Sequence, residues 1–318
     1  MGGTMAVLQI NATPDGPRLH ASPGALAPAL RQGLESTGPI VIMIHGYKFD
    51  PTNRQTCPHR HILSLSPKRD CVKAVSWPRG LGFSGQAANE GLAIGFGWSA
   101  RGTIWGAYGR AAQAGRALAE LIGMIARLAP DLPVHLLAHS LGARVALTAL
   151  PHVTTAGVGR VILLSGADYG QTAREALQSP AGNNAEIINV TSRENDLFDF
   201  LLERLVTPPT HGDWTLAHGM PQAANTLTLQ LDHRETLRVL RGAGFEIAPP
   251  GGRVCHWSSY IRQGVFPLYR ALLRQPDNLP LVQLRAALPK GCDPRWSRIW
   301  PTGWTAPEGA MARPQTPL

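Results

Sequence analysis

One run, residues 134–145, constrains the fold more than any other part of the chain: Val-His-Leu-Leu-Ala-His-Ser-Leu-Gly-Ala-Arg-Val. An apolar, strand-like stretch gives way to helix-forming residues, and Ser140 lies at the change. A residue at so sharp a turn has a strained backbone, so the residues two before and two after it must be small. Ala138 and Gly142 meet that demand. The pattern predicts that the Ser140 hydroxyl projects from the end of a strand as a candidate nucleophile.

A second apolar run, residues 39–44, is rich in β-branched side chains and ends in His45-Gly46-Tyr47-Lys48. A continuous run of this kind predicts a buried parallel strand, and the glycine after it predicts a tight turn. Backbone N–H groups in such a turn can stabilise the alkoxide that forms when a serine attacks a carbonyl. One such donor lowers the barrier by about 3 kcal/mol.

Together these motifs resemble the α/β-hydrolase superfamily, and within it lipase-like and uncharacterised bacterial hydrolases. The resemblance rests on His-Gly-Tyr at 45–47, Ser-Trp-Pro at 76–78 and Ala-His-Ser-x-Gly at 138–142, and it extends over residues 38–275. It implies a mostly parallel central sheet with helices on both faces. It also implies an oxyanion hole formed by the N–H groups of Tyr47 and Leu141, and an acid and a histidine that follow the serine in that order.

The acid is expected in the loop after the second strand beyond the serine. Strand-like runs cover residues 159–166 and 185–191, and the second leads into Ser-Arg-Glu-Asn-Asp at 192–196. A carboxylate at this position can reach a histidine beside the serine, so Asp196 is predicted as the acid. Three other carboxylates remain candidates: Glu194, Asp199 and Asp168.

His256 is predicted as the base. It precedes the amphipathic run 261–273, in a loop that resembles the closing histidine loop of the superfamily. His233 competes with it, since it follows the strand-like run 226–232, but its surroundings are typical of a helix start. His211 and His218 lie in a segment rich in Pro, Gly and Trp, at about 200–225, that is a candidate cap or lid.

The resemblance therefore implies a serine hydrolase. His256 would take the proton of Ser140 as it attacks a carboxylic ester or a related acyl bond, while Asp196 orients the imidazole, and water would release the acyl group. A small ester or acyl compound is the expected substrate, and no cofactor is implied. A thioesterase, an amidase, a lyase and a non-catalytic binding protein remain alternatives, because a fold does not fix its chemistry.

Residues 79–106 combine many glycines with large apolar side chains and follow the strand-like run 72–77. This stretch is either the wall of an acyl or aromatic pocket or a connecting loop packed on the sheet. A long amphipathic helix is expected over residues 107–128. Three aromatic side chains are predicted to contact substrate: Trp98, Trp105 and Tyr108.

Length and composition favour one hydrolase domain over residues 1–275, followed by an extension rich in Pro and Trp over 276–318 with one short helix at 281–288. The runs 5–12 and 18–21 are expected to form an antiparallel sheet edge. No apolar run is long enough to span a bilayer and no signal pattern opens the chain, so a cytoplasmic location without stable membrane insertion is expected.

The chain of 318 residues carries a formal net charge of +9, but its basic residues are spread along the sequence, and no nucleic-acid partner is expected. Cys57, His59, His61 and Cys71 offer possible zinc ligands, yet their spacing is not that of a known finger. No metal site is therefore expected.

Overall fold

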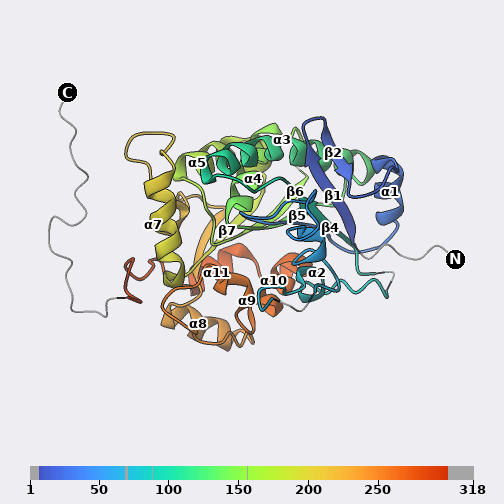
Figure 1. Ribbon diagram of the computed structural model, residues 1–318. Helices are drawn as coiled ribbons and strands as arrows, with labels where there is room; N and C mark the ends of the chain where they lie inside the picture. Colours follow the sequence, from blue (N-terminus) through green and yellow to red (C-terminus); the bar gives the residue numbers. More distant parts are fainter. Residues whose placement is uncertain (1–6, 69–70, 88, 156, 300–318) are drawn as a thin grey trace, which may run out of the picture.

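An eight-stranded sheet forms the middle layer of the computed structural model, which describes residues 7–68, 71–87, 89–155 and 157–299 (Figure 1). The strand order is β2-β1-β4-β3-β5-β6-β7-β8, and every neighbouring pair is parallel except β1 with β2. The strands are β1 (Leu8–Thr13), β2 (Gly16–Leu19), β3 (Ile40–Ile44), β4 (Leu92–Gly97), β5 (Val134–His139), β6 (Val158–Leu164), β7 (Glu186–Thr191) and β8 (Thr226–Gln230).

Helices cover both faces of the sheet, as predicted (Figure 1). One face packs against α1 (Leu26–Gly33), α3 (Ile104–Leu128), α4 (Leu141–Ala149), α5 (Gly170–Gln178) and α6 (Pro180–Asn184). The other face packs against α2 (Trp77–Gly80), α8 (Arg234–Gly242), α9 (Ser258–Ile261), α10 (Val265–Arg274) and α11 (Leu281–Ala287). Helix α7 (Asp196–Leu205) lies on the left of Figure 1, at the side of the molecule opposite β1 and β2.

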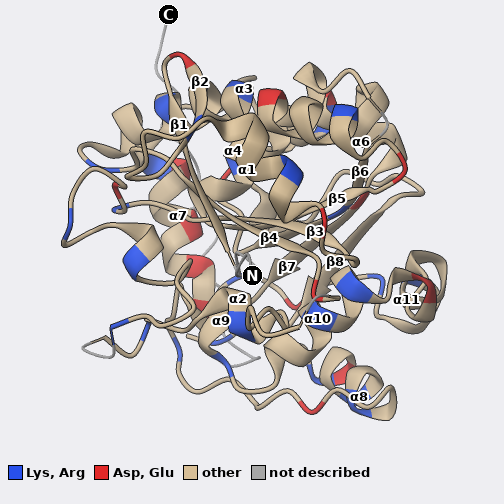
Figure 2. Ribbon diagram, turned by 90° about the vertical axis from the view of Figure 1, so that its right-hand side faces the viewer, with Lys and Arg blue, Asp and Glu red and all other residues tan. Residues whose placement is uncertain are grey.

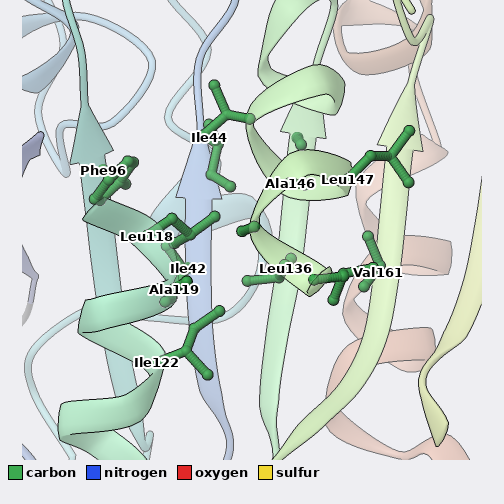
Figure 3. Close-up of a cluster of buried hydrophobic side chains, with 14 of the residues drawn as sticks. Ile42, Ile44, Phe96, Leu118, Ala119, Ile122, Leu136, Ala146, Leu147 and Val161 are labelled. Carbon is green, nitrogen blue, oxygen red and sulfur yellow. The ribbon is translucent and has the colours of Figure 1, made fainter. Parts of the chain in front are cut away.

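The central strands are apolar on both sides because both of their faces are covered. In β3, Ile42 and Ile44 face one helix layer, whereas Val41 and Met43 face the other. Successive side chains of a strand point to opposite faces, so a continuous apolar run supplies both cores at once. Figure 3 shows the first core, where the strand residues Ile42, Ile44, Phe96, Leu136 and Val161 meet Leu118, Ala119, Ile122, Ala146 and Leu147 of α3 and α4.

The strands predicted at 39–44, 134–139, 159–166, 185–191 and 226–232 are observed as β3, β5, β6, β7 and β8. Helix α3 confirms the predicted helix and begins a few residues earlier, at Ile104. The expected antiparallel edge is formed by β1 and β2, although residues 5 and 6 lie outside the described part of the chain.

The glycine-rich stretch is where the sequence prediction was wrong. Residues 92–97 form the fully buried strand β4 between β1 and β3, whereas the predicted strand at 72–77 is a loop over 72–76, with Val72 88% exposed, followed by Trp77 at the start of α2. The glycines of β4 leave room for a neighbouring segment, because a Cβ on Gly97 would lie 2.7 Å from His59 Nε2. Close approach, and not flexibility, explains the composition of this strand.

The short helix predicted in the C-terminal extension forms α11, which buries Leu281 and Leu284 in the second core. The extension beyond residue 299 lies outside the described residues. The predicted cap or lid at 200–225 corresponds to the end of α7 and the loop after it. Across the described ranges, no helix is long and apolar enough to cross a membrane. Basic residues occur on helices and loops throughout the view of Figure 2, with acidic residues among them.

Candidate active site

Ser140 lies at the sharp turn between β5 and α4, where φ is 54° and ψ is −126°. A non-glycine residue in this part of the φ/ψ map carries about 1–3 kcal/mol of strain. Flanking hydrogen bonds hold it there, since Ser140 N–H donates to Leu164 O at 3.0 Å and Ala167 N–H donates to Ser140 O at 3.0 Å. The strained turn predicted from the sequence is therefore present, and it is tied to the end of β6.

Two glycines let the turn after β3 lie directly against the turn at Ser140. A Cβ on Gly46 would lie 2.6 Å from Ser140 Cβ, and a Cβ on Gly142 would lie 2.7 Å from His45 O. Real Cβ atoms do not approach other atoms so closely, so a side chain at either position would push the two turns apart.

His256 is the histidine that reaches the serine, because its Nε2 accepts a hydrogen bond from Ser140 Oγ at 2.9 Å. It lies in the loop between α8 and α9. His139 Nε2–H donates to the His256 carbonyl at 3.1 Å, and the ring of Phe198 in α7 stacks on the imidazole with the centroids 4.7 Å apart. These contacts fix both the backbone and the ring plane of His256.

The imidazole of His256 is neutral at neutral pH. Burial, with smaller contributions from His139 and Lys73, holds its pKa well below the ordinary value. A neutral ring with a lone pair on Nε2 is the form that can accept a proton from a serine hydroxyl.

Asn195, and not the predicted Asp196, meets the other side of the ring. Its Oδ1 is 2.6 Å from His256 Nδ1 and accepts the Nδ1–H hydrogen bond. Asp196 begins α7 and faces elsewhere: its Oδ2 accepts from Trp296 N–H at 2.5 Å, and its Oδ1 is 3.2 Å from Arg193 Nη1. Successive residues at a helix start point in directions about 100° apart, so only one of the pair can face His256. The contact to His256 therefore comes from Asn195 in the predicted segment and not from the predicted Asp196.

The other candidate acids have separate partners. Glu194 pairs with Arg262, and its backbone carbonyl accepts from Cys255 N–H at 2.8 Å, so it supports the loop that carries His256. Asp168 is fully buried and accepts from Tyr108 O–H at 2.7 Å. Asp199 accepts from Asn195 Nδ2–H at 2.8 Å, one hydrogen bond away from the imidazole.

The competing histidines lie elsewhere. His233 caps α8, where its Nδ1 accepts from Thr236 N–H at 3.3 Å. His218 Nε2 lies 3.5 Å from Glu203 Oε1, and His211 is exposed in the loop after α7. The helix start predicted around His233 is therefore correct.

The two predicted oxyanion donors flank Ser140. Leu141 is the first residue of α4, a position whose N–H has no partner within the helix, and Tyr47 follows the Gly46 contact. Among the described residues, neither the Tyr47 N–H nor the Leu141 N–H has a hydrogen-bond acceptor. Both donors are thus available to a bound ligand.

His45 fixes the peptide that carries the Tyr47 N–H. Its Nδ1–H donates to Gly46 O at 2.9 Å, and the Gly46 carbonyl and the Tyr47 N–H belong to the same peptide plane. His45 Nε2 accepts from Trp98 N–H at 3.0 Å. Burial lowers the His45 pKa to about 4, so the ring stays neutral and keeps this pair of contacts at neutral pH.

The three aromatic residues predicted to contact substrate differ in position. Trp98 is 1% exposed and its Nε1–H donates to His45 O, so it supports the turn after β3 and is not a pocket wall. Tyr108 is half-buried and bonded to Asp168, under the guanidinium of Arg144. Trp105 is 59% exposed, and its Nε1–H donates to Leu205 O of α7.

Helix α7 carries an apolar face towards solvent. Leu197, Leu201 and Leu205 are 38%, 43% and 43% exposed, and their four-residue spacing places them on one side of the helix. Phe198 of the same helix stacks on His256, so α7 carries both a ring contact to the histidine and an exposed apolar face.

The four cysteines are free thiols. Cys57 Sγ lies 3.7 Å from His20 Nε2, and His59 Nε2 bonds to Asn11 Oδ1 at 2.8 Å. Within the described ranges, no three His, Cys, Asp or Glu side chains are grouped as metal ligands.

The parallel sheet covered on both faces, with a serine at the strained β5–α4 turn, defines an α/β-hydrolase fold. Residues 25–165 match the model of a family described as "Alpha/beta hydrolase of unknown function (DUF900)". This match and the fold support a place in the α/β-hydrolase superfamily and a hydrolase activity.

A solved structure, the lipase BlEst2 of Bacillus licheniformis in its mature form, is similar at 13% identity with a TM-score of 0.41. The similarity covers 75% of this chain and 93% of the lipase. No curated protein matches the chain significantly.

Proposed function

We propose that the protein is a serine hydrolase that cleaves a carboxylic ester or a related acyl bond. The observation that carries the proposal is the 2.9 Å hydrogen bond from Ser140 Oγ to the neutral imidazole of His256, made at a turn where Ser140 has a φ of 54°. A serine becomes a nucleophile when a base within hydrogen-bond reach can remove its proton.

The mechanism follows from these contacts. His256 Nε2 takes the Ser140 proton as Oγ attacks the carbonyl carbon, and the developing oxyanion is bound by the N–H groups of Tyr47 and Leu141. Asn195 Oδ1 holds the Nδ1–H, which keeps the Nε2 lone pair directed at the serine. His256 then gives its proton to the leaving alcohol, and an activated water hydrolyses the acyl-enzyme.

The surroundings of the serine favour a small substrate with an apolar group. Phe198 of α7 lies against the His256 ring, and the same helix exposes three leucines and contacts Trp105 through Leu205 O, so α7 offers apolar contact area to a substrate. A thioester or an amide would use the same serine and the same donors, so the preferred acyl bond has to be measured.

The test is hydrolysis of p-nitrophenyl esters of increasing acyl length, together with matched thioester and amide substrates. Ser140→Ala should abolish hydrolysis of every substrate that the native protein cleaves. Ser165→Ala is the matched control, because Ser165 also ends a strand at positive φ, 46°, but its Oγ bonds to Ser259 Oγ at 3.0 Å. Equal activity of the native protein and Ser140→Ala would refute the proposal.

A further inference from the structure

The Asn195 amide is held at both ends. Its Oδ1 accepts from His256 Nδ1–H at 2.6 Å, and its Nδ2–H donates to Asp199 Oδ1 at 2.8 Å. Asp199 lies four residues further along, one helical turn into α7, and is 3% exposed. A hydrogen-bonded chain therefore runs from a buried carboxylate through an amide and an imidazole to the Ser140 hydroxyl.

An amide can present either its oxygen or its NH₂ group to a neighbour, and the choice matters here. With the oxygen towards His256, the imidazole carries its proton on Nδ1 and has a lone pair on Nε2 for the serine. With the NH₂ group towards His256, the amide donates to Nδ1, so the proton moves to Nε2 and the serine has no base. Asp199 decides between the two, because a carboxylate oxygen accepts from the NH₂ group and would repel the amide oxygen.

We propose that Asp199 is a positioning residue for the nucleophilic reaction of Ser140, an inference that rests on the proposed function. By accepting the Asn195 Nδ2–H hydrogen bond it turns the amide oxygen towards His256, and so selects the imidazole tautomer that can take the serine proton. A triad with a carboxylate next to its histidine needs no such residue, because either carboxylate oxygen accepts the Nδ1–H.

The surroundings of Asp199 allow its charge to change near neutral pH. Burial raises its pKa to about 7, which Arg295 and Arg193 partly oppose and Asp196 reinforces. Its second oxygen, Oδ2, has no hydrogen-bond partner among the described residues. A proton on Oδ2 leaves Oδ1 free to accept, so the amide stays oriented. The ionised form of Asp199 adds a negative charge that stabilises the imidazolium form of His256. His139 and Lys73 disfavour that imidazolium.

The test is a double-mutant cycle on the full chain, with Asp199→Leu, Asn195→Asp and the double variant Asn195→Asp/Asp199→Leu. The readout is the rate at which a fluorophosphonate labels Ser140, which requires no knowledge of the substrate. Asp199→Leu should label at least about 100-fold more slowly than the native protein, since the wrong tautomer is costly in triads of this kind. The double variant should label within about tenfold of Asn195→Asp, because a carboxylate at position 195 needs no orientation.

A purely structural role for Asp199 would give the same loss in both backgrounds, and that result would overturn the proposal. Because ionised Asp199 stabilises the imidazolium, the native labelling rate should rise as the pH passes about 7. Asp199→Asn keeps an acceptor oxygen, so it serves as the control in case the leucine variant misfolds. It should label within about tenfold of the native rate and lack the rise near pH 7. A rate as low as that of a folded Asp199→Leu, or a retained increase near pH 7, would also count against the proposal.

Nitrogen NMR of histidine-labelled protein reads the tautomer directly. His256 should carry its proton on Nδ1 in the native protein and in Asp199→Asn, and lose this preference in Asp199→Leu. This readout separates the two proposals, because an unlabelled Ser140 in the native protein refutes the hydrolase while the tautomer shift still tests Asp199. An Nδ1–H tautomer that persists in a folded Asp199→Leu variant would refute the positioning role.

Discussion

Asn195 Oδ1 lies 2.6 Å from His256 Nδ1, so an uncharged amide occupies the place where a carboxylate was predicted. The amide orients the ring as a carboxylate would, because it accepts the same Nδ1–H hydrogen bond. It does not supply the full negative charge that stabilises an imidazolium. The neighbouring Asp196 faces Arg193 instead, with Oδ1 3.2 Å from Nη1.

Asp196→Asn should leave Ser140 reactivity within about threefold of native and lower the stability. The carboxylate is fully buried, pairs with Arg193 and accepts a hydrogen bond from Trp296 N–H, and a hydrogen bond to a charged group contributes about 1.5–3 kcal/mol. Urea unfolding and fluorophosphonate labelling on the same preparations check both effects. A variant of native stability whose labelling is lost would show that Asp196, and not Asn195, serves His256.

His45→Asn should lower kcat by about 10- to 100-fold with a small effect on KM, because the Tyr47 N–H is needed most when the oxyanion forms. The ring of His45 fixes that peptide through Gly46 O. His135→Asn is the matched control, since His135 is also buried and its Nδ1 accepts from Arg160 N–H at 2.9 Å, away from Ser140 at the start of β5. The control should lose stability and keep kcat; equal kcat losses would contradict the role given to His45.

Gly142→Ala should reduce both stability and Ser140 reactivity, because the added methyl would meet His45 O at 2.7 Å and push the two turns apart. A misfit of this kind costs about 1–3 kcal/mol. Gly123→Ala in α3 is the control, since its Cβ would have only Arg127 Nη1 nearby, at 3.6 Å. Thermal unfolding should show the control slightly more stable than native, by up to about 1 kcal/mol, and Gly142→Ala less stable.

Stability should fall as the pH drops from about 6.5 to about 4. His45, His135 and His139 are buried with pKa values lowered to about 4, so in this window these three rings are protonated in the unfolded chain and neutral in the folded protein. Each contributes about 3 kcal/mol that is present above the unfolded pKa and lost below the folded one. Asp199, with its raised pKa, opposes them as a single group.

Urea unfolding at pH 7 and pH 5 measures this dependence, and His135→Asn should reduce the difference between the two. A difference that His135→Asn leaves unchanged would mean that other groups bind the protons.

Much of the site follows from local sequence patterns. The strained turn at Ser140 needs small neighbours and an adjoining strand and helix, all of which are visible in the run 134–145. Strands β5 to β8 are parallel neighbours, so the segment after β7 lies at the carboxyl ends of the strands, as the serine does. The loop before α9 reaches the same end of the sheet. The pairing of Ser140 with His256 was predictable for that reason.

The errors have a different origin. Asn195 and Asp196 are adjacent, and which of them faces His256 depends on where α7 begins, within one residue. The buried strand β4 was not recognised because its glycines, needed for the approach of His59, are also typical of loops. Trp98 was assigned to a pocket because a sequence does not distinguish a buried aromatic ring from one that lines a cavity. The last two errors depend on tertiary contacts, and the first depends on a helix boundary.

The most direct measurement is mass-spectrometric mapping of the residue modified by a fluorophosphonate, in the native protein, Ser140→Ala and His256→Gln. The account predicts stoichiometric modification of Ser140 in the native protein, none in Ser140→Ala, and a rate at least about 1000-fold lower in His256→Gln. An unmodified Ser140 in the folded native protein, or modification that His256→Gln leaves equally fast, would contradict it.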